Sequence, residues 1–540
     1  MDIHTQARPH TLSRINAFSS ADDPPATSST HNLAGIEGFS SSSSSSSTPA
    51  ASPSSEPDSF IKTADVSPLI HPRDPQSDHD QLDMMDSYRE SQASSSTSTL
   101  SLGSDSPATT PGSGSENGDH RGGLADMADL HLDAEAHSPF SQRYILVVGG
   151  LGFIGSHTSL ELLKNGYNVI MVDNLSNSYP GVLTAIKHLA AKECQRRGRV
   201  MPAVRFHDID YQSPAMQFLL DSYSEPVSPP RAAAGPNGEA EAEGRQRVTY
   251  RSQIAGVIHF AAFKSVVESI SNPLDYYDNN VCGLVQLLRQ LSKYNIRNFV
   301  FSSSATVYGS KATVGKLLRE EDIIHHEEST TDERGNEVKV EPTMVGLTCP
   351  YARTKYFAEA ILADVAASDP KWRIVSLRYF NPIGCDPSGL IGESPRNTPT
   401  NLFPVIAQVL TGQRAQLDVF GRDWDTADGT PVRDFIHVSD IARGHIAALD
   451  GAPCDAPFRT YNLGSGTGTT VHEAVKSLEQ ASGKAIGINW AGRRPGDVGF
   501  CVASNERARA ELGWTPRESI AKCARDLWNY VRKQDTKNYS

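Results

Sequence analysis

The chain has 540 residues, with 63 acidic and 50 basic side chains and a formal net charge of −13. Its seven cysteines are dispersed and have no zinc-site spacing, which predicts free thiols in a reducing, cytoplasmic compartment and no metal site. No segment resembles a membrane span or a signal peptide, which argues against a membrane protein.

The N-terminal quarter differs in composition from the rest. Residues 1–140 contain 20 acidic and 6 basic side chains, and the remaining 400 residues contain 43 and 44, so no basic excess favours nucleic acid. The run Ser40–Ser47 and the frequent Pro and Thr predict a disordered, Ser-rich acidic tail over residues 1–141, because this composition buries too little apolar surface to offset chain entropy. Arg8 and Arg14 would suit a mitochondrial presequence, but the nearby acids count against one.

From residue 142 onward, apolar strand-like segments alternate with helical ones. The helical segments include 153–165, 273–291 and 351–367. Near-continuous apolar strands between helices predict an α/β fold with a doubly wound, Rossmann-like parallel sheet covered on both faces. The predicted strands are RYILVV (143–148), NVIMVD (168–173), AVRFHD (203–208), AGVIHF (255–260), NFVFSS (298–303) and RIVSLRYF (373–380).

A glycine motif, GGLGFIGSH, lies between the first strand and the first helix and places Gly149, Gly152 and Gly155 three residues apart. Glycines at such a turn let backbone N–H groups approach a pyrophosphate at a helix N-terminus. Asp173 ends the next strand, where a carboxylate accepts from ribose hydroxyls and repels a 2′-phosphate. The combination predicts an NAD site, although a glycine turn without a ligand is the alternative.

Tyr351 and Lys355 stand four residues apart in TCPYARTKY, a spacing that places both side chains on one face of a helix. Tyrosine is a poor base because its phenol titrates near pH ~10, and a nearby ammonium lowers that pKa by favouring the phenolate. The preceding strand ends in the hydroxyl residues Ser302–Ser304. With the glycine motif upstream, the set resembles that of the extended short-chain dehydrogenases/reductases, which implies removal of a hydroxyl proton while hydride leaves the same carbon. The tyrosine–lysine spacing alone also occurs in ordinary helices.

Two segments interrupt the alternation and are interpreted as surface insertions, at about 222–250 and 310–346. The first is rich in Pro, Ala, Gly and charge, and the second carries a charged patch. His325 and His326 lie beside acids in the second insertion, and a solvated loop is favoured over a metal site because no spaced ligand set accompanies them.

The motifs and the interruptions together predict a three-part organisation. A disordered tail precedes an NAD-binding domain, and a smaller, Pro- and Gly-rich substrate-binding domain follows. The predicted boundaries are 1–141 for the tail, 142–381 for the NAD-binding domain and 382–540 for the substrate-binding region, with about 431–465 returning to the NAD-binding domain.

Over nearly all of residues 143–530 the chain resembles the UDP-glucose 4-epimerases of the extended short-chain dehydrogenase/reductase superfamily. The resemblance rests on VIHFAAFKSVVESISNPLDYYDNNV (257–281), SSSATVYG (302–309), PYARTK (350–355), RYFNPIG (378–384), VRDFIHV (432–438) and YNLGSGTG (461–468). It implies interconversion of UDP-galactose and UDP-glucose through a 4-keto intermediate, as in galactose metabolism, with NAD as a tightly bound prosthetic group. It also implies a homodimer formed through helices near 273–291 and 351–367.

The resemblance assigns roles to individual residues. Tyr351 would take the proton from the sugar 4-hydroxyl, Lys355 would lie beside the nicotinamide ribose, and Ser304 would bridge the sugar O4 and the phenol. The implied cofactor-binding residues are Gly149, Gly152, Phe153, Ile154, Gly155, Asp173, Asn174, Asn177, Ser178, Asp208, Ile209, Phe260, Ala261, Lys264, Asn279, Tyr351, Lys355 and Phe380. The residues implied to hold the UDP are Asn381, Asn401, Leu402, Phe420, Arg433 and Arg494.

Two alternatives stay open at this point. One is a nucleotide-sugar dehydratase or decarboxylase of the same fold, and the other is a non-catalytic NAD-sensing regulator. A dehydratase needs additional acid/base groups beside the hydroxyl, whereas Ala305 and Thr306 follow Ser304. A regulator has no use for a tuned phenol, so the complete set of Tyr351, Lys355 and Ser304 favours catalysis.

Cys501 falls where members of this family carry either a tyrosine or a small residue, beside the hexose C2 position. A buried cysteine commonly serves only to fill space as a small apolar side chain. That role is compatible with a position beside the hexose C2, because the size of the side chain sets the volume of the pocket. A small side chain there leaves room for an N-acetyl group. The resemblance therefore implies additional activity on UDP-N-acetylglucosamine and UDP-N-acetylgalactosamine.

The tail hypothesis predicts the behaviour of a shortened protein. A chain beginning near Ser141 should fold, bind NAD and epimerise like the full chain, because no expected site residue lies before it. Activity and bound NAD of the two purified chains give the comparison, and loss of NAD or of solubility on truncation would show that the tail is required.

Overall fold

The computed structural model describes residues 143–227, 248–313, 315–331, 334–343, 345–451, 456–494 and 496–538. The predicted tail and the middle of the first insertion lie outside these ranges. The chain divides into two units, Met1–Asp119 and His120–Ser540, and every described residue belongs to the second. Within these ranges no helix combines the length and the apolar character needed to cross a membrane.

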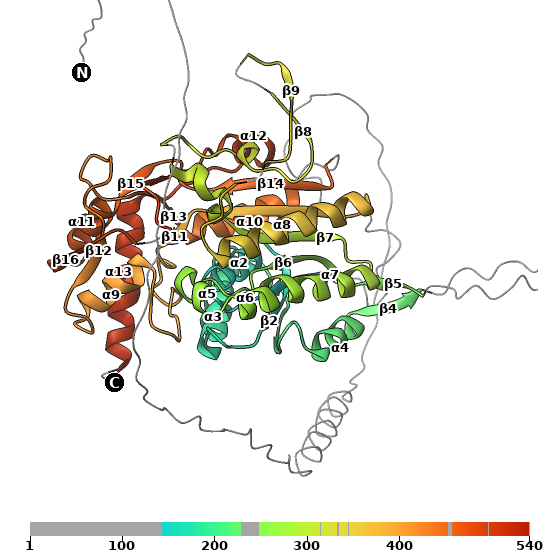
Figure 1. The fold of residues 1–540 in the computed structure, drawn as a ribbon. Helices are drawn as coiled ribbons and strands as arrows, with labels where there is room; N and C mark the ends of the chain where they lie inside the picture. The colour runs from blue at the N-terminus through green and yellow to red at the C-terminus, as the bar shows by residue number, and fades with distance from the viewer. Residues whose placement is uncertain are drawn as a thin grey trace, which may run out of the picture. The chain divides into compact units, whose positions relative to one another are not determined.

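The second unit is built on a seven-stranded sheet, ordered β14-β10-β7-β6-β1-β2-β3, in which every neighbouring pair is parallel (Figure 1). Its strands are β1 (Tyr144–Val148), β2 (Asn168–Asp173), β3 (Val204–Asp208), β6 (Ile254–His259), β7 (Asn298–Ser304), β10 (Arg373–Tyr379) and β14 (Phe458–Leu463). The six predicted strands and the doubly wound sheet are confirmed. The strand order reverses between β1 and β6, where such sheets bind ligands at their carboxyl ends.

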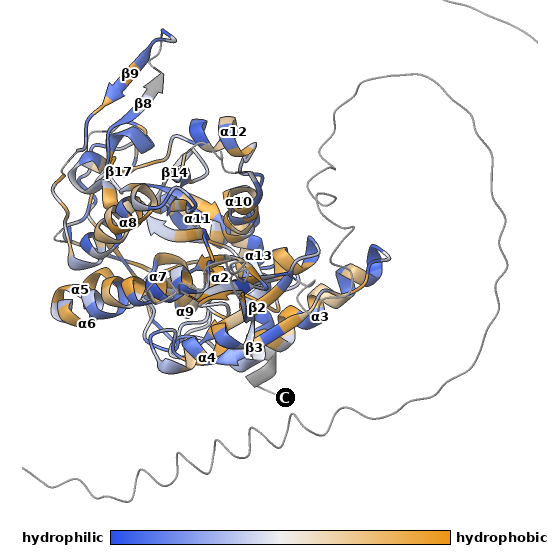
Figure 2. Ribbon diagram, turned by 90° about the vertical axis from the view of Figure 1, so that its right-hand side faces the viewer, coloured by the Kyte–Doolittle hydropathy of each residue, from blue (hydrophilic) through white to orange (hydrophobic). Residues whose placement is uncertain are grey.

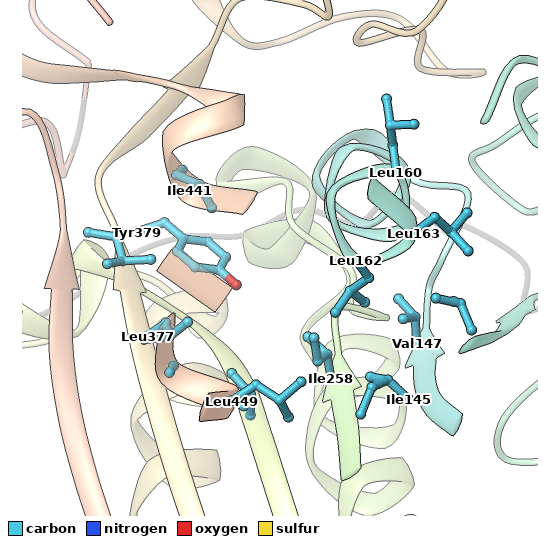
Figure 3. Close-up of a cluster of buried hydrophobic side chains, with 14 of the residues drawn as sticks. Ile145, Val147, Leu160, Leu162, Leu163, Ile258, Leu377, Tyr379, Ile441 and Leu449 are labelled. Atoms are coloured by element: carbon cyan, nitrogen blue, oxygen red, sulfur yellow. The ribbon is translucent and has the colours of Figure 1, made fainter. Parts of the chain in front are cut away.

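Helices bury both faces of this sheet, which explains why its strands are almost continuously apolar. Side chains of α2 (Phe153–Lys164), α3 (Pro180–Arg196) and α10 (Val438–Gly451) share one buried cluster with the sheet. Figure 3 shows part of it, with Leu162 of α2 beside strand residues such as Ile258. Side chains of α4 (Pro214–Ser222), α7 (Gly283–Lys293) and α8 (Pro350–Ser368) form the cluster on the other face.

The helix predicted over 273–291 contains a break. It consists of α6 (Pro273–Tyr277), a π-helical turn at Asp278–Cys282, and α7. Inside that turn the buried Asn280 amide donates to the Phe263 carbonyl (3.0 Å) and the Thr354 hydroxyl (3.1 Å), and its oxygen accepts from the Phe263 N–H (2.8 Å). These tertiary contacts account for the local widening, and π-turns of this kind often mark functional sites.

A smaller region follows β10 in the chain. Its elements are β11 (Asn381–Ile383), α9 (Leu402–Leu410), β12 (Leu417–Phe420), β13 (Val432–His437), β15 (Gly468–Thr470), α11 (Val471–Ser482), β16 (Ile488–Ala491), β17 (Phe500–Cys501), α12 (Glu506–Leu512) and α13 (Ile520–Asn538). Strands β11, β13, β15 and β17 form one small sheet, while β12 pairs with β16. The sequence predicts that the segment at about 431–465 returns to the large domain. Its strand β13 belongs to the small sheet, whereas β14 is an edge strand of the large sheet and α10 packs against that sheet.

The expectation that the second insertion is a solvated loop is wrong for its first part. Leu318, Glu320 and Ile323 are buried, and the His325 side chain is only 3% exposed, whereas that of His326 is 49% exposed. The cause is Arg378 of β10, a fully buried guanidinium that must find acceptors. It donates to the carbonyls of Glu320 (3.1 Å) and Ile323 (2.8 Å).

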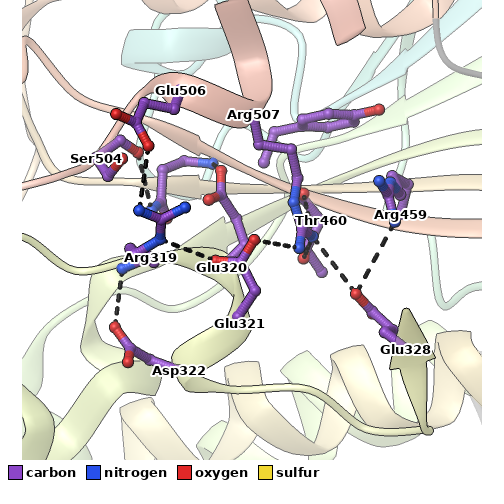
Figure 4. Close-up of polar contacts among 12 residues, drawn as sticks. Arg319, Glu320, Glu321, Asp322, Glu328, Arg459, Thr460, Ser504, Glu506 and Arg507 are labelled. Carbon is purple, nitrogen blue, oxygen red and sulfur yellow. Dashed lines mark hydrogen bonds and ion pairs between the residues drawn. The ribbon is translucent and has the colours of Figure 1, made fainter. Parts of the chain in front are cut away.

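Ion pairs attach the same segment to the end of the chain. Figure 4 shows Glu321 meeting Arg507 (2.9 Å), and Glu328 lies 3.5 Å from the same guanidinium. Beyond this anchored part, β8 (Glu328–Thr331) and β9 (Glu337–Val340) form an antiparallel hairpin. The first insertion likewise begins and ends in a paired hairpin, β4 (Ser224–Val227) with β5 (Thr249–Ser252).

Candidate active site

A cavity of about 1080 Å³ is lined both by the carboxyl ends of the large sheet and by the smaller region. Of all the residues expected at the site, only Asp208 does not line it. Asp208 is exposed at the end of the edge strand β3, and the next residues, Ile209 and Asp210, line the cavity. The expected residues that do line it are Gly149, Gly152, Phe153, Ile154, Gly155, Asp173, Asn174, Asn177, Ser178, Ile209, Phe260, Ala261, Lys264, Asn279, Ser304, Tyr351, Lys355, Phe380, Asn381, Asn401, Leu402, Phe420, Arg433, Arg494 and Cys501.

The glycine turn is sterically required at two positions. Gly149 has φ +83°, and a Cβ there would lie 2.8 Å from the Ala261 nitrogen; a Cβ on Gly155 would lie 2.0 Å from the Gly149 oxygen. A Cβ on Gly152, by contrast, would lie no closer than 3.5 Å to its nearest neighbour, the Gly149 oxygen, and this residue lines the cavity. The turn thus packs β1, β6 and α2 closely and leaves the N-terminus of α2 accessible, which fits the pyrophosphate of NAD.

The Asp173 carboxylate is fixed at this turn. Its Oδ2 accepts from the Leu151 N–H (2.9 Å), and its Oδ1 accepts from the Leu175 N–H (3.0 Å) and the Ser178 hydroxyl (2.8 Å). An ionised carboxylate can accept about four hydrogen bonds, so acceptor capacity remains for a ribose hydroxyl. The residues present therefore fit NAD at this end of the cavity.

The N-terminal half of α8 supplies the phenol and the ammonium. Pro350 occupies the first turn, and the buried Cys349 caps the helix, its sulfur accepting from the Ala352 N–H (3.4 Å). One turn after Tyr351, the Lys355 ammonium donates to the Ser302 carbonyl at the end of β7 (2.6 Å). The predicted side-by-side placement of the two residues on one helix face is thus observed within the cavity lining.

Burial acts on the two groups in opposite directions. It raises the pKa of Tyr351 to about 12, while a hydrogen bond from the Ser304 hydroxyl lowers it. Burial lowers the pKa of Lys355 to about 7, while the Glu359 carboxylate raises it. Burial thus disfavours both charged forms, so a phenolate near neutral pH requires further positive charge beside the ring. Each unit by which the phenol pKa falls corresponds to about 1.4 kcal/mol of stabilisation of the phenolate relative to the phenol.

Two arginines line the smaller region's side of the cavity and share one carboxylate. Arg433 donates to Oδ1 of Asp497 (2.5 Å), and Arg494 donates to Oδ2 (3.1 Å) while lying 4.5 Å from the centre of the Phe420 ring. Paired guanidinium groups suit a diphosphate. Sequence reasoning missed Asp497, although its position three residues after Arg494 was a signal for a pairing.

Sequence reasoning also missed Glu393. Its carboxylate accepts from Lys264 (2.9 Å) and from the Asn401 amide (3.2 Å), and so connects two expected site residues from different parts of the cavity. Glu393 lies eight residues from Asn401 and 129 residues from Lys264 in the chain, and no helix or strand spacing could have revealed this connection. Among the described residues, no three His, Cys, Asp or Glu side chains gather in a way that could hold a metal ion.

Comparison with known proteins agrees with this geometry. The model of the NAD dependent epimerase/dehydratase family matches residues 145–225 and 240–464. UDP-glucose 4-epimerase 2 of Arabidopsis thaliana is 41% identical over 391 residues, which cover 72% of this chain and 95% of the relative.

Two solved structures are similar in fold and sequence. The UDP-glucose 4-epimerase of Stenotrophomonas maltophila, with bound NAD and formylated UDP-arabinopyranose, has a TM-score of 0.60 and 34% identity, covering 73% of this chain and all of that one. The enzyme of Bifidobacterium longum, in complex with NAD⁺ and UDP, has a TM-score of 0.58 and 37% identity, covering 73% and 99%. The chain described here belongs to the NAD dependent epimerase/dehydratase family.

Proposed function

We propose that the protein is a UDP-glucose 4-epimerase that interconverts UDP-galactose and UDP-glucose in galactose metabolism, with NAD as a tightly bound cofactor. The observation that carries the proposal is one shared cavity lining. A glycine turn that fits a pyrophosphate lies at one part of it, a pair of arginines lies at another, and Tyr351, Lys355 and Ser304 line it as well.

NAD, when bound, would supply the hydride acceptor and a positive charge that favours the phenolate. Tyr351 accepts the proton of the sugar 4-hydroxyl, and the Ser304 hydroxyl lies in hydrogen-bonding contact with that phenol. The Lys355 ammonium, fixed on the Ser302 carbonyl, favours the phenolate form. Tyr351 later returns the proton to the sugar oxygen, so the protein ends the cycle in its starting state.

Inversion at C4 requires that the 4-keto sugar present its other face before it is reduced. Arg433 and Arg494 are held in place by Asp497, so the diphosphate can stay anchored while the hexose turns. Asn381, the first residue of β11 in the small sheet, and Leu402, at the start of α9, also line the cavity and would complete the nucleotide site.

The residues at the site do not match either competing function. A dehydratase requires a further acid or base beside Ser304, but the next residues are Ala305 and Thr306, and the Thr306 hydroxyl donates to the Ser304 oxygen (3.0 Å). A non-catalytic NAD sensor would not need a buried lysine directly behind a phenol. Epimerisation uses every member of the set and requires no additional one.

The catalytic role of Tyr351 has a direct test. Tyr351→Phe keeps the ring and removes the proton acceptor, so kcat for UDP-galactose should fall by at least about 10³-fold while bound NAD is retained. Tyr223→Phe, whose ring packs against Tyr144 away from the cavity, is the matched control and should leave turnover unchanged. Near-normal activity of the Tyr351 variant would exclude the mechanism.

We further propose that the enzyme accepts UDP-N-acetylglucosamine and UDP-N-acetylgalactosamine. Cys501 of β17 lines the cavity, pairs in register with Arg433, and has a thiol pKa raised to about 12 by burial. The thiol is therefore neutral, small and unreactive at physiological pH, which is the character of a space-filling side chain. Because the Cys501 side chain is small, the cavity can accommodate an N-acetyl group at the hexose C2 position.

Substituting Cys501 should separate the two pairs of substrates. In Cys501→Tyr the larger ring should remove activity on UDP-N-acetylgalactosamine while UDP-galactose is still converted, whereas Cys501→Ala should retain both. Steady-state kinetics with each substrate measures the ratio. Wild-type protein that converts UDP-galactose but not UDP-N-acetylgalactosamine would refute this substrate range.

We also propose a cytoplasmic homodimer. All six cysteines in the described part of the chain are free thiols, as expected in a reducing compartment. Large apolar side chains are exposed on the neighbouring helices α6 and α8, at Leu274 and Phe357, and Figure 2 shows apolar turns where α5 (Val266–Ser271) and α6 lie. Sedimentation equilibrium should give twice the mass of the chain, and a monomer at micromolar concentration would contradict the dimer.

A further inference from the structure

Glu359 lies one turn beyond Lys355 on α8 and is completely buried. The four-residue spacing places its carboxylate on the same helix face as the ammonium. It raises the pKa of Lys355 against the opposing effect of burial. The charge on Lys355, on which the phenolate depends, is therefore linked to where the Glu359 carboxylate is held.

Arg378 of β10 contacts both oxygens of that carboxylate. Its guanidinium donates to Glu359 Oε2 (2.8 Å) through Nη2 and to Oε1 (3.1 Å) through Nε, and the Ser376 hydroxyl also donates to Oε1 (3.0 Å). The positive charge of Arg378 offsets that of the carboxylate. The net field at Lys355 therefore depends on the orientation of Glu359 between the arginine and the ammonium.

His325 holds the same carboxylate from the second insertion. Its Nε2 donates to Glu359 Oε2 (3.0 Å), and its ring packs 4.8 Å from the centre of the Tyr356 ring on α8. The insertion is fixed here because Arg378 donates to its carbonyls and Arg507 pairs with Glu321 (Figure 4). A segment outside the cavity thus reaches the second turn of the catalytic helix.

The other groups that face Lys355 carry no negative charge. On β7 it contacts the Ser302 carbonyl and hydroxyl, and on β6 burial lowers the pKa of His259 to about 3, so that ring is neutral. On β10 burial raises the pKa of the Tyr379 phenol, which interacts with Tyr351 and Ser302 and stays protonated. Glu359 is the carboxylate that acts on Lys355 in the described part of the chain.

We propose that His325 is a positioning residue for catalysis: by donating to Glu359 Oε2, the oxygen that Arg378 Nη2 also contacts, it fixes the carboxylate in the orientation from which its negative charge acts on Lys355. The second insertion thereby contributes to the turnover rate without touching the substrate. This inference rests on the proposed function, because it concerns how the Tyr351 phenolate is maintained.

The experiment compares His325→Leu, which removes the donor, with His325→Gln, which keeps an N–H at similar reach, in the full-length holoenzyme. The leucine variant should lower kcat for UDP-galactose by about tenfold, the effect of one unit of pKa, with KM unchanged. The alkaline limb of its kcat–pH profile should move to lower pH, because Lys355 loses its charge earlier. His325→Gln should restore both, and His326→Gln, at the exposed neighbour, should change neither.

A second readout does not depend on turnover. Ultraviolet titration of tyrosinate, with Tyr351→Phe as the blank, should show the Tyr351 phenol ionising at higher pH in His325→Leu than in wild type. If the leucine variant does not fold, His325→Asn, whose amide is too short to reach Glu359, takes its place beside His325→Gln.

The outcomes are distinguishable. Wild-type protein that does not convert UDP-galactose would reject the proposed function itself. Wild-type conversion together with an unchanged kcat, pH profile and phenol titration in the variant without a donor would overturn the role of His325. A lower kcat with unshifted pH limbs and an unshifted phenol would also overturn it, because that pattern reflects general damage to packing.

Discussion

The site depends on a pair of charges that burial opposes. Burial raises the pKa of the Tyr351 phenol to about 12 and lowers the pKa of the Lys355 ammonium to about 7, so it opposes the charged form of each group. An ammonium one turn from a phenol on α8 favours the phenolate, and a cationic cofactor ring would add to that effect. The surrounding structure holds these two side chains in position and excludes solvent from them.

The fold brings the required groups to one edge. Parallel strands end on the same side of the sheet, so the glycine turn after β1, Asp173 of β2 and Ser304 of β7 meet there without special packing. The smaller region adds the arginines held by Asp497. Behind α8, the buried Glu359–Arg378 pair places a second set of charges where solvent cannot screen them, which gives that pair influence over Lys355.

Local patterns in the sequence predicted the strands, the glycine turn and the Tyr351–Lys355 spacing, because each depends on neighbours within a few residues. Long-range partnerships had no such signal. The insertion around His325 looked solvated because its partners are more than fifty residues away in the chain: Arg378 donates to its backbone carbonyls, and Arg507 pairs with Glu321. Asp208 was placed in the site by resemblance, yet at the edge strand it is exposed and the cavity begins with the residue that follows.

The proposed epimerisation requires that the cavity residues hold one NAD tightly enough that it would be regenerated within each cycle and would not be consumed. The most direct measurement incubates purified full-length protein with UDP-galactose and no added cofactor, and follows UDP-glucose formation. The account predicts many turnovers per chain to an equilibrium mixture, with no net change in the redox state of the bound nucleotide. Conversion that stops after one turnover, or that requires added NAD and accumulates the reduced form, would contradict it.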